Sequence, residues 1–193
     1  MKKKAALLKA LELAKEHGFH FSIEEVGFES FVDEELKRFD KGVDAATNSK
    51  ALEMLRKVKS QYGNTLSVHV GHSVILFHPW TTLDSLSMNL KVMAEYNDVF
   101  PRFYPLNLTL YSEFLPIFSR VVEEGCAVPA DYAYGWDYTQ KDPLVTKAYE
   151  LYQALYDAIG PGMSIGDYLD AIMLVRDHSV DEILFQQFGL EPV

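Results

Sequence analysis

The sequence of 193 residues contains a single cysteine, Cys126. One cysteine excludes a disulfide within the chain, and it also excludes a zinc or iron–sulfur site built from cysteines alone. The sequence also lacks a glycine-rich phosphate loop, a nucleophile elbow and an H-E-x-x-H zinc motif. Those absences remove the usual signatures of nucleotide hydrolases, serine hydrolases and zinc proteases.

Basic residues are also scarce, with 18 Lys and Arg against 28 Asp and Glu, which gives a net charge of −10. Such a surface repels phosphate backbones, so we expect no nucleic-acid partner. No apolar run approaches the roughly 20 residues that span a bilayer. The leucine-containing N-terminal segment is interrupted by Lys9, Glu12, Lys15 and Glu16, which predicts an amphipathic helix rather than a signal peptide. We therefore expect no membrane partner and a cytoplasmic location.

Hydrophobic periodicity predicts three strands that alternate with helices through residue 126. The strands are expected at residues 19–28, 65–78 and 106–111, with a bulge or break at Gly71 in the second. Helices are expected before Gly18 and near residues 33–39, 47–62, 83–96 and 114–124. This alternation indicates parallel strands with right-handed crossovers, and hence an α/β sheet or part of a barrel.

The alternation ends near residue 126, and an aromatic, proline-flanked loop follows at residues 128–143. Its alternating aromatics, Tyr132, Tyr134, Trp136 and Tyr138, form either a substrate lid or a strap packed on the core; we favour the strap. Two or three further helices are expected between residues 144 and 188. We therefore divide the chain into an α/β part, residues 1–126, and a tail of loop and helices, residues 127–193.

In parallel α/β folds, ligands bind at the carboxyl ends of the strands. Residues 27–30, 77–82 and 107–112 occupy such positions, and they share one rim if the strands are neighbours. The Glu29 carboxylate can accept two hydroxyl hydrogens of a ribose, and the apolar strand end before Pro79 can wall a flat ring, with His78 lining the pocket. Alternatively, Glu29 caps the following helix and Ser30 binds the loop backbone. The residues alone do not decide between these two interpretations.

Three segments of the chain resemble the radical S-adenosylmethionine (SAM) enzymes. VGFESFVDEELKRFDKGVDAATNSKALEMLRKVKS, residues 26–60, is similar to a strand ending in G-x-E-S, followed by D-x-x-L-K-x-x-x-K-G and a helix rich in Ala and Leu. SVILFHPWTTLDSLSMNLKVM, residues 73–93, is similar to the next unit, a strand ending in Phe-x-Pro-x-Thr-Thr and its helix. LNLTLYSEFLPIFSRVVEEG, residues 106–125, is similar to the last unit. The resemblance is closest to the branch that often carries an upstream cobalamin-binding domain.

The resemblance implies a partial, half TIM-like barrel: three parallel βα units followed by a helical C-terminal tail. It implies that Glu29, beside Gly27, contacts the ribose or the amino-acid part of SAM. The other implied contributors are Ile75, Leu76 and Phe77 beside the adenine, Leu110 and Tyr111 at its border, Ser30 and Thr81 at the rim, and His78 where Asp or Gly is common in the family.

The chain departs from this family in the residues that carry its chemistry. It lacks the C-x-x-x-C-x-x-C loop of the [4Fe–4S] cluster and the Gly-Gly-Glu-type segment that holds the SAM amino group. We therefore expect the SAM-binding C-terminal portion of a radical SAM enzyme, inactive alone and active only when completed by a cluster-binding half. Cobalamin is a further cofactor of that branch, and the substrate stays open.

Two alternatives to this expectation remain. The first is a non-catalytic half-barrel that pairs with an N-terminal half, or with a second copy through its open strand edges. The second is an α/β protein that shares the pattern but binds a different small molecule.

Overall fold

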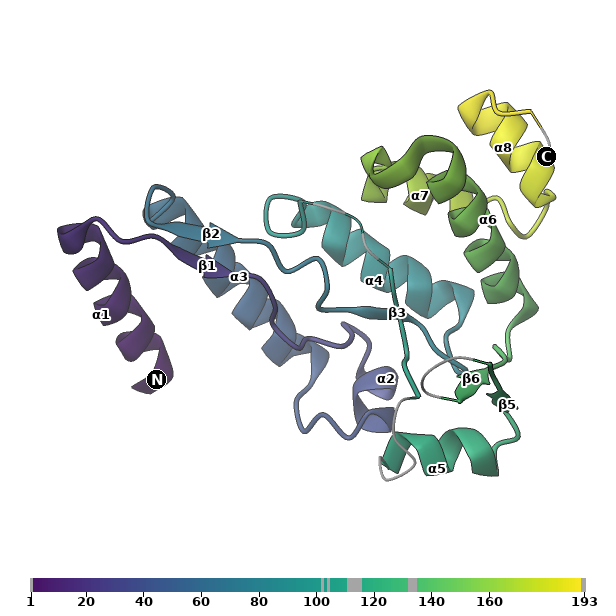
Figure 1. The fold of residues 1–193 in the computed structure, drawn as a ribbon, viewed down its shortest axis with the longest axis horizontal. Helices are drawn as coiled ribbons and strands as arrows, with labels where there is room; N and C mark the ends of the chain where they lie inside the picture. Colours follow the sequence, from purple (N-terminus) through teal and green to yellow (C-terminus); the bar gives the residue numbers. More distant parts are fainter. Residues whose placement is uncertain (1, 102, 104, 111–115, 132–134, 192–193) are drawn as a thin grey trace.

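Short strands and longer helices alternate through the first part of the chain, as the periodicity predicts. The computed structural model describes residues 2–101, 103, 105–110, 116–131 and 135–191. The helices of this part are α1 (Lys2–His17), α2 (Asp33–Arg38), α3 (Ala45–Gln61), α4 (Leu83–Glu95) and α5 (Pro116–Glu123). The strands are β1 (Phe21–Ile23), β2 (Leu66–Val68), β3 (Ile75–Phe77) and β4 (Leu106–Asn107). Helix α1 and the last helix of the chain lie toward opposite ends of the long axis (Figure 1).

Local signals in the sequence explain where α3 and α4 begin and which face each helix buries. Asp44 caps α3 by accepting from the backbone N–H of Thr47, and Thr82 forms a capping box with Ser85 at the start of α4. The inward faces of the two helices carry residues at helical spacing: Leu52, Leu55 and Val58 in α3, and Leu86, Leu90 and Met93 in α4.

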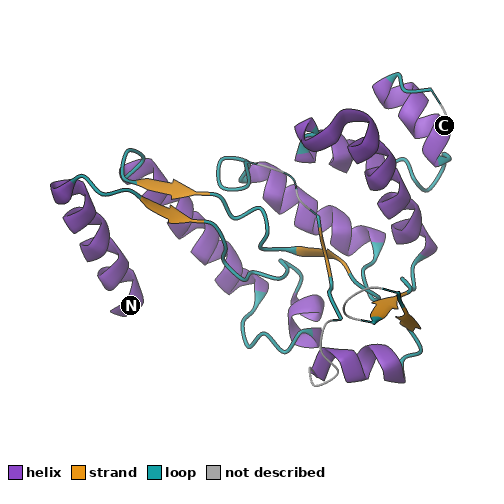
Figure 2. Ribbon diagram, in the orientation of Figure 1, coloured by secondary structure: helices purple, strands orange, loops and turns teal. Residues whose placement is uncertain are grey.

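Strands β1 to β4 pair in parallel, and the described residues form the mixed α/β fold that the sequence predicts. Strand β1 pairs with β2, β3 pairs with β4, and Glu29 forms a parallel bridge with Val74 between them. Strands β2 and β3 come from one predicted strand, which is interrupted by a turn at Gly71. The strands are shorter than predicted, and the described residues form three two-stranded sheets and no closed barrel (Figure 2). The half-barrel therefore stays a prediction.

The tail contains a hairpin that the sequence pattern did not predict. Strands β5 (Ala127–Pro129) and β6 (Trp136–Tyr138) pair antiparallel. Trp136 and Tyr138 are half-buried and pack on an apolar cluster, as a strap would, whereas Asp137 between them is exposed; Tyr132 and Tyr134 lie outside the described residues. The helices that follow are α6 (Pro143–Ile159), the short 3₁₀ turn η1 (Gly160–Gly162), α7 (Ile165–Ile172) and α8 (Val180–Phe188).

One main core joins the two parts into which the sequence was divided. It contains Leu52 and Leu90 of α3 and α4 together with Leu151 and Tyr168 of α6 and α7. A smaller cluster of Leu108, Leu110, Phe118, Val121 and Cys126 lies under α5 and the hairpin. Leu76 belongs to the main core and Ile75 packs on the smaller cluster. Strand β3 is thus covered on both sides, as its continuous apolar run predicts.

Asp142 fixes the junction between the α/β part and the tail. Its Oδ1 accepts from the N–H of Leu144 at 2.9 Å, and its Oδ2 accepts from the N–H of Leu83 at 3.2 Å. One carboxylate therefore satisfies a free N–H at the start of α6 and another at the start of α4. Because both helix N-termini carry partial positive charge, a carboxylate between them is also favoured electrostatically.

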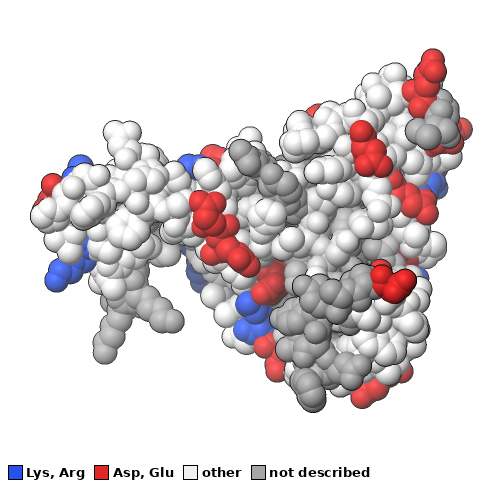
Figure 3. All heavy atoms as spheres, in the orientation of Figure 1, with Lys and Arg blue, Asp and Glu red and all other residues white. Residues whose placement is uncertain are grey.

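Acidic side chains outnumber basic ones on the face of the molecule drawn in Figure 3. This agrees with the net charge of −10. None of the described helices combines the length and the apolar character that crossing a membrane requires.

Candidate functional site

The backbone places Glu29 beyond the end of β1, in a parallel bridge with Val74, the residue before β3. The N–H of Glu29 donates to the carbonyl of Ser73, and its carbonyl accepts from the N–H of Ile75, both at 2.8 Å. Glu29 has a φ of +62°, a left-handed conformation that is uncommon for a residue other than glycine. Since both of its backbone groups are bonded, the neighbouring segment holds Glu29 in this conformation.

The Glu29 carboxylate lies at the surface beside a lysine and a glycine. Its Oε1 is 2.7 Å from Nζ of Lys41, and the two side chains are 27% and 32% exposed. A Cβ at Gly27 would lie 3.0 Å from Nζ of Lys41 and 3.1 Å from Oε1 of Glu29. A side chain at position 27 would therefore press on this ion pair.

Behind Glu29, four polar side chains form what we call the buried polar cluster: Ser30, Glu35, His78 and Asn89. Ser30 donates to Oε2 of Glu35 at 2.5 Å, and the amide of Asn89 donates to the same oxygen at 3.1 Å. Nε2 of His78 lies 3.2 Å from Oε1 of Glu35, in contact but outside good hydrogen-bond alignment. All four side chains are buried. They link the segment before α2, helix α2 itself, helix α4 and the residue after β3.

Contacts in the buried polar cluster set the pKa of Glu35. The N–H of Trp80 donates to Nδ1 of His78 at 3.2 Å, and Nε2 of the same ring faces Glu35. Burial raises the pKa of the Glu35 carboxyl, but the contact with His78 and the hydrogen bond from Ser30 lower it more. The pKa of Glu35 therefore lies below its ordinary value of 4.5.

The cluster also organises the backbone that presents Glu29. Oδ1 of Asn89 accepts from the N–H of Phe31 at 2.7 Å, and the amide of Asn48 donates to the carbonyls of Phe28 and Ser30 at 2.8 Å. Helices α3 and α4 thus hold the chain on both sides of Glu29 through one amide side chain each.

The structure brings some of the predicted site residues together and separates others. Gly27, Glu29 and the partly buried Ile75 lie together where Glu29 forms its bridge with Val74. The side chains of Ser30, His78 and Thr81 are buried, and those of Leu76, Phe77 and Leu110 belong to the apolar clusters. Thr81 accepts from the N–H of His78 and donates to the carbonyl of Leu76. Tyr111 lies outside the described residues.

The sequence analysis missed Glu35, Asn48 and Asn89 as members of this site. Asn89 gave a usable signal, because it lies three residues from Leu86 and one from Leu90, on the buried face of α4. Glu35 gave no such signal, because it lies in the acidic first turn of α2, where carboxylates are ordinarily exposed to solvent. Its burial depends on Ser30, His78 and Asn89, which are brought to it from other elements.

Two hollows lie beside the carboxyl ends of β3 and β4. One, of about 500 Å³, is lined by Trp80, Thr81 and Thr82 after β3 and by charged residues that include Arg38, Glu124 and Lys141. These charges are paired, since Glu124 contacts both Arg38 and Lys141 and accepts from the indole of Trp80. The other, of about 460 Å³, is lined by Asn107 at the end of β4 together with Tyr138 and Tyr149.

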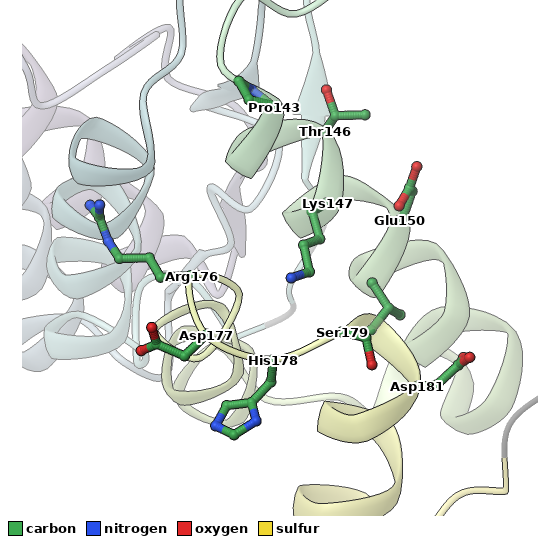
Figure 4. Close-up of a pocket in the computed structure, with 10 residues that line it drawn as sticks. Pro143, Thr146, Lys147, Glu150, Arg176, Asp177, His178, Ser179 and Asp181 are labelled. Carbon is green, nitrogen blue, oxygen red and sulfur yellow. The ribbon is translucent and has the colours of Figure 1, made fainter.

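A third hollow, of about 600 Å³, lies away from the strand ends, between α6 and the segment before α8 (Figure 4). Its basic side chains do not converge on its centre. Lys147 donates to the carbonyl of Val175 at 2.7 Å, and Arg176 pairs with Asp84 at 3.0 Å. This hollow therefore offers no cluster of cations to a ligand.

No group of three or more metal-binding side chains is found among the residues that the structure describes. Cys126 is buried in the smaller apolar cluster, at 3% exposure. A comparison of the chain with protein-family models, with curated proteins and with solved structures finds no match.

Proposed function

We propose that this chain is the SAM-binding C-terminal portion of a radical SAM enzyme, with its three parallel strand segments forming part of a half TIM-like barrel. The observation that carries the proposal is the placement of Glu29. A partly exposed carboxylate stands in a parallel bridge with Val74 beside the amino end of β3, and the backbone bonds to Ser73 and Ile75 hold it there. The proposal includes the cytoplasmic location of the chain that we expect from the sequence.

The Glu29 carboxylate suits the hydroxyl groups of a ribose. Lys41 contacts Oε1, which orients the carboxylate and leaves Oε2 to accept a hydrogen bond from a ribose hydroxyl. A hydrogen bond to a charged acceptor is stronger than one between neutral groups. Because Gly27 carries no Cβ, it leaves space for a ligand beside the Glu29 carboxylate. In this proposal Glu29 binds and orients the ligand, Gly27 admits it, and the buried polar cluster holds the strand end.

The cofactors of the complete enzyme fit this chain unequally. The [4Fe–4S] cluster does not fit, since Cys126 is the one cysteine of the sequence and is buried. The ribose side of SAM fits at Glu29. On the adenine side, Ile75 is partly exposed, whereas Leu76 and Phe77 are buried. In a complete enzyme SAM supplies the radical chemistry, and the residues of this chain bind and orient it. Nothing among the described residues bears on cobalamin.

A second candidate function is an assembly module that pairs with another chain. Among the described strands, β1 pairs with β2 alone, so its other edge has no strand partner. Phe19 and Phe21 beside that edge are 67% and 44% exposed, unusually high for phenylalanine. Because an unpaired edge with exposed apolar side chains favours strand addition, this candidate predicts a dimer in sedimentation that Phe21→Lys converts to monomer. A monomer at all concentrations would remove the self-pairing form of this candidate.

Calorimetric titration of the purified chain with SAM tests the main proposal. We expect binding that Glu29→Gln weakens about tenfold or more, because the variant replaces a charged acceptor with a neutral one. The matched control is Glu25→Gln, which removes the same charge from an exposed residue nearby in the sequence, and we expect its affinity to stay within about twofold of the unmodified chain. Equal affinities of the folded Glu29→Gln variant and the unmodified chain, or no binding to either, would contradict the proposal.

A further inference from the structure

The hollow at the end of β4 is built on the two central strands. Asn107 is the last residue of β4 and lines it, and Tyr138 and Tyr149 line it from β6 and α6. The hydroxyl of Tyr138 donates to the carbonyl of Phe77, the last residue of β3, at 2.7 Å. Its volume of about 460 Å³ lies within the range of small-molecule sites, roughly 300–1,000 Å³.

The two tyrosine rings are held in place by contacts beneath them. The ring of Tyr149 meets the ring of Phe77 edge to face, with centroids 4.9 Å apart, and its hydroxyl accepts from the amide of Asn107 at 3.0 Å. Because that hydroxyl oxygen is the acceptor, its own hydrogen can be donated to a ligand. A ligand here meets aromatic walls that lose little freedom on binding.

The remaining described residues that line the hollow are short and polar: Asp137, Thr139, Gln140 and Thr146. They offer two hydroxyls, an amide and a carboxylate. Lys and Arg do not occur among the described residues that line it. With a carboxylate in the lining and a net charge of −10 on the chain, an anionic ligand would be repelled.

From this lining we infer that the hollow at the end of β4 binds a small polyhydroxylated ring compound, uncharged or cationic, of the chemical class of sugars and amino sugars. Hydroxyl groups on such a ring match side chains that both donate and accept, and its C–H faces match the tyrosine rings. The inference does not depend on the SAM proposal, because the hollow and Glu29 share no described residue.

Titrations of the ¹⁵N-labelled full chain with three probes test the inference: glucose, glucosamine and glucose 6-phosphate. We expect glucosamine and glucose to shift the amide signals of Asn107, Thr139 and Tyr149, with glucosamine binding at least as tightly as glucose. Glucose 6-phosphate should bind at least tenfold more weakly than glucosamine. Equal binding of all three, or no shifts at these residues with any of them, would overturn the inference.

Two variants separate this site from general surface binding. Tyr149→Phe keeps the ring and removes the hydroxyl, so we expect the dissociation constant for glucosamine to rise about threefold to tenfold. Tyr156→Phe is the matched control on the same helix, since Tyr156 is 40% exposed and does not line the hollow; its affinity should not change. An equal effect of the two substitutions would contradict the assignment, and it would leave SAM binding at Glu29 untouched.

Discussion

Replacing Glu35 with alanine is expected to lower the free energy of unfolding by about 3–5 kcal/mol. The substitution removes the acceptor of the Ser30 hydroxyl and of the Asn89 amide, and it removes the carboxylate that His78 contacts. Each of these donors is buried, so water cannot replace the lost acceptor. The loss should exceed that of an ordinary surface substitution several-fold.

Urea denaturation followed by circular dichroism measures this effect. Glu34→Ala is the matched control, since Glu34 is the exposed neighbour in the same helical turn, and its free energy of unfolding should change by about 0.5 kcal/mol or less. A Glu35→Ala variant as stable as Glu34→Ala would show that the buried polar cluster does not support the fold.

The same carboxyl gives the stability a dependence on pH. The pKa of Glu35 is lowered below 4.5 in the folded protein, so its ionised form stabilises the fold above that pH. This stabilisation is lost as the pH falls through the folded-state pKa. Glu35→Gln should therefore show a smaller fall in the free energy of unfolding below pH 4.5 than the unmodified chain shows, and an identical fall in both would contradict the assignment.

Replacing Tyr168 with alanine is expected to lower the free energy of unfolding by about 3–5 kcal/mol as well. Tyr168 of α7 is fully buried, its ring lies 5.1 Å from that of Phe103, and its hydroxyl donates to the carbonyl of Ala148 at 2.7 Å. The substitution opens a large cavity between the tail helices and the α/β part. Because the two parts share one core, the whole chain should unfold at a lower urea concentration.

Two probes of unfolding, read in parallel, check this expectation. Tryptophan fluorescence reports on Trp80 and Trp136, which pack beside the smaller cluster, and circular dichroism reports on all helices. Both midpoints should fall together in Tyr168→Ala, while Tyr168→Phe, which keeps the ring, should cost about 1 kcal/mol. A tryptophan midpoint unchanged by Tyr168→Ala would mean that α6, α7 and α8 unfold separately from the smaller cluster on which Trp80 and Trp136 pack.

Local signals account for the parts of the fold that the sequence predicts well. The helices carry capping residues such as Asp44 and Thr82 and buried leucines at regular spacing, and both signals are readable from neighbouring positions. Gly71 is also a local signal, and it predicts the interruption of the second predicted strand. The hairpin of β5 and β6 was not predicted, because six residues separate its two short strands in the sequence and they carry no two-residue turn signature.

The candidate site was predictable only where it depends on strand ends. Glu29 follows an apolar segment in the sequence, and the structure places it in a parallel bridge with Val74, although beside the amino end of β3 and not at a carboxyl end. The partnership of Glu35 with His78 joins residues that lie 43 positions apart in the printed sequence, and no local pattern carries that information. His78 was expected to line a pocket, yet its ring is fully buried against Glu35.

The most direct test of the central claim is an amide ¹H–¹⁵N spectrum of the full chain recorded with and without SAM. If Glu29 binds the ribose, the signals of Gly27, Glu29 and Ile75 should shift with SAM, and adenosine should shift the same signals. Signals in α8, at the far end of the molecule (Figure 1), should stay in place. Shifts confined to other regions, or an unchanged spectrum at millimolar SAM, would contradict the account.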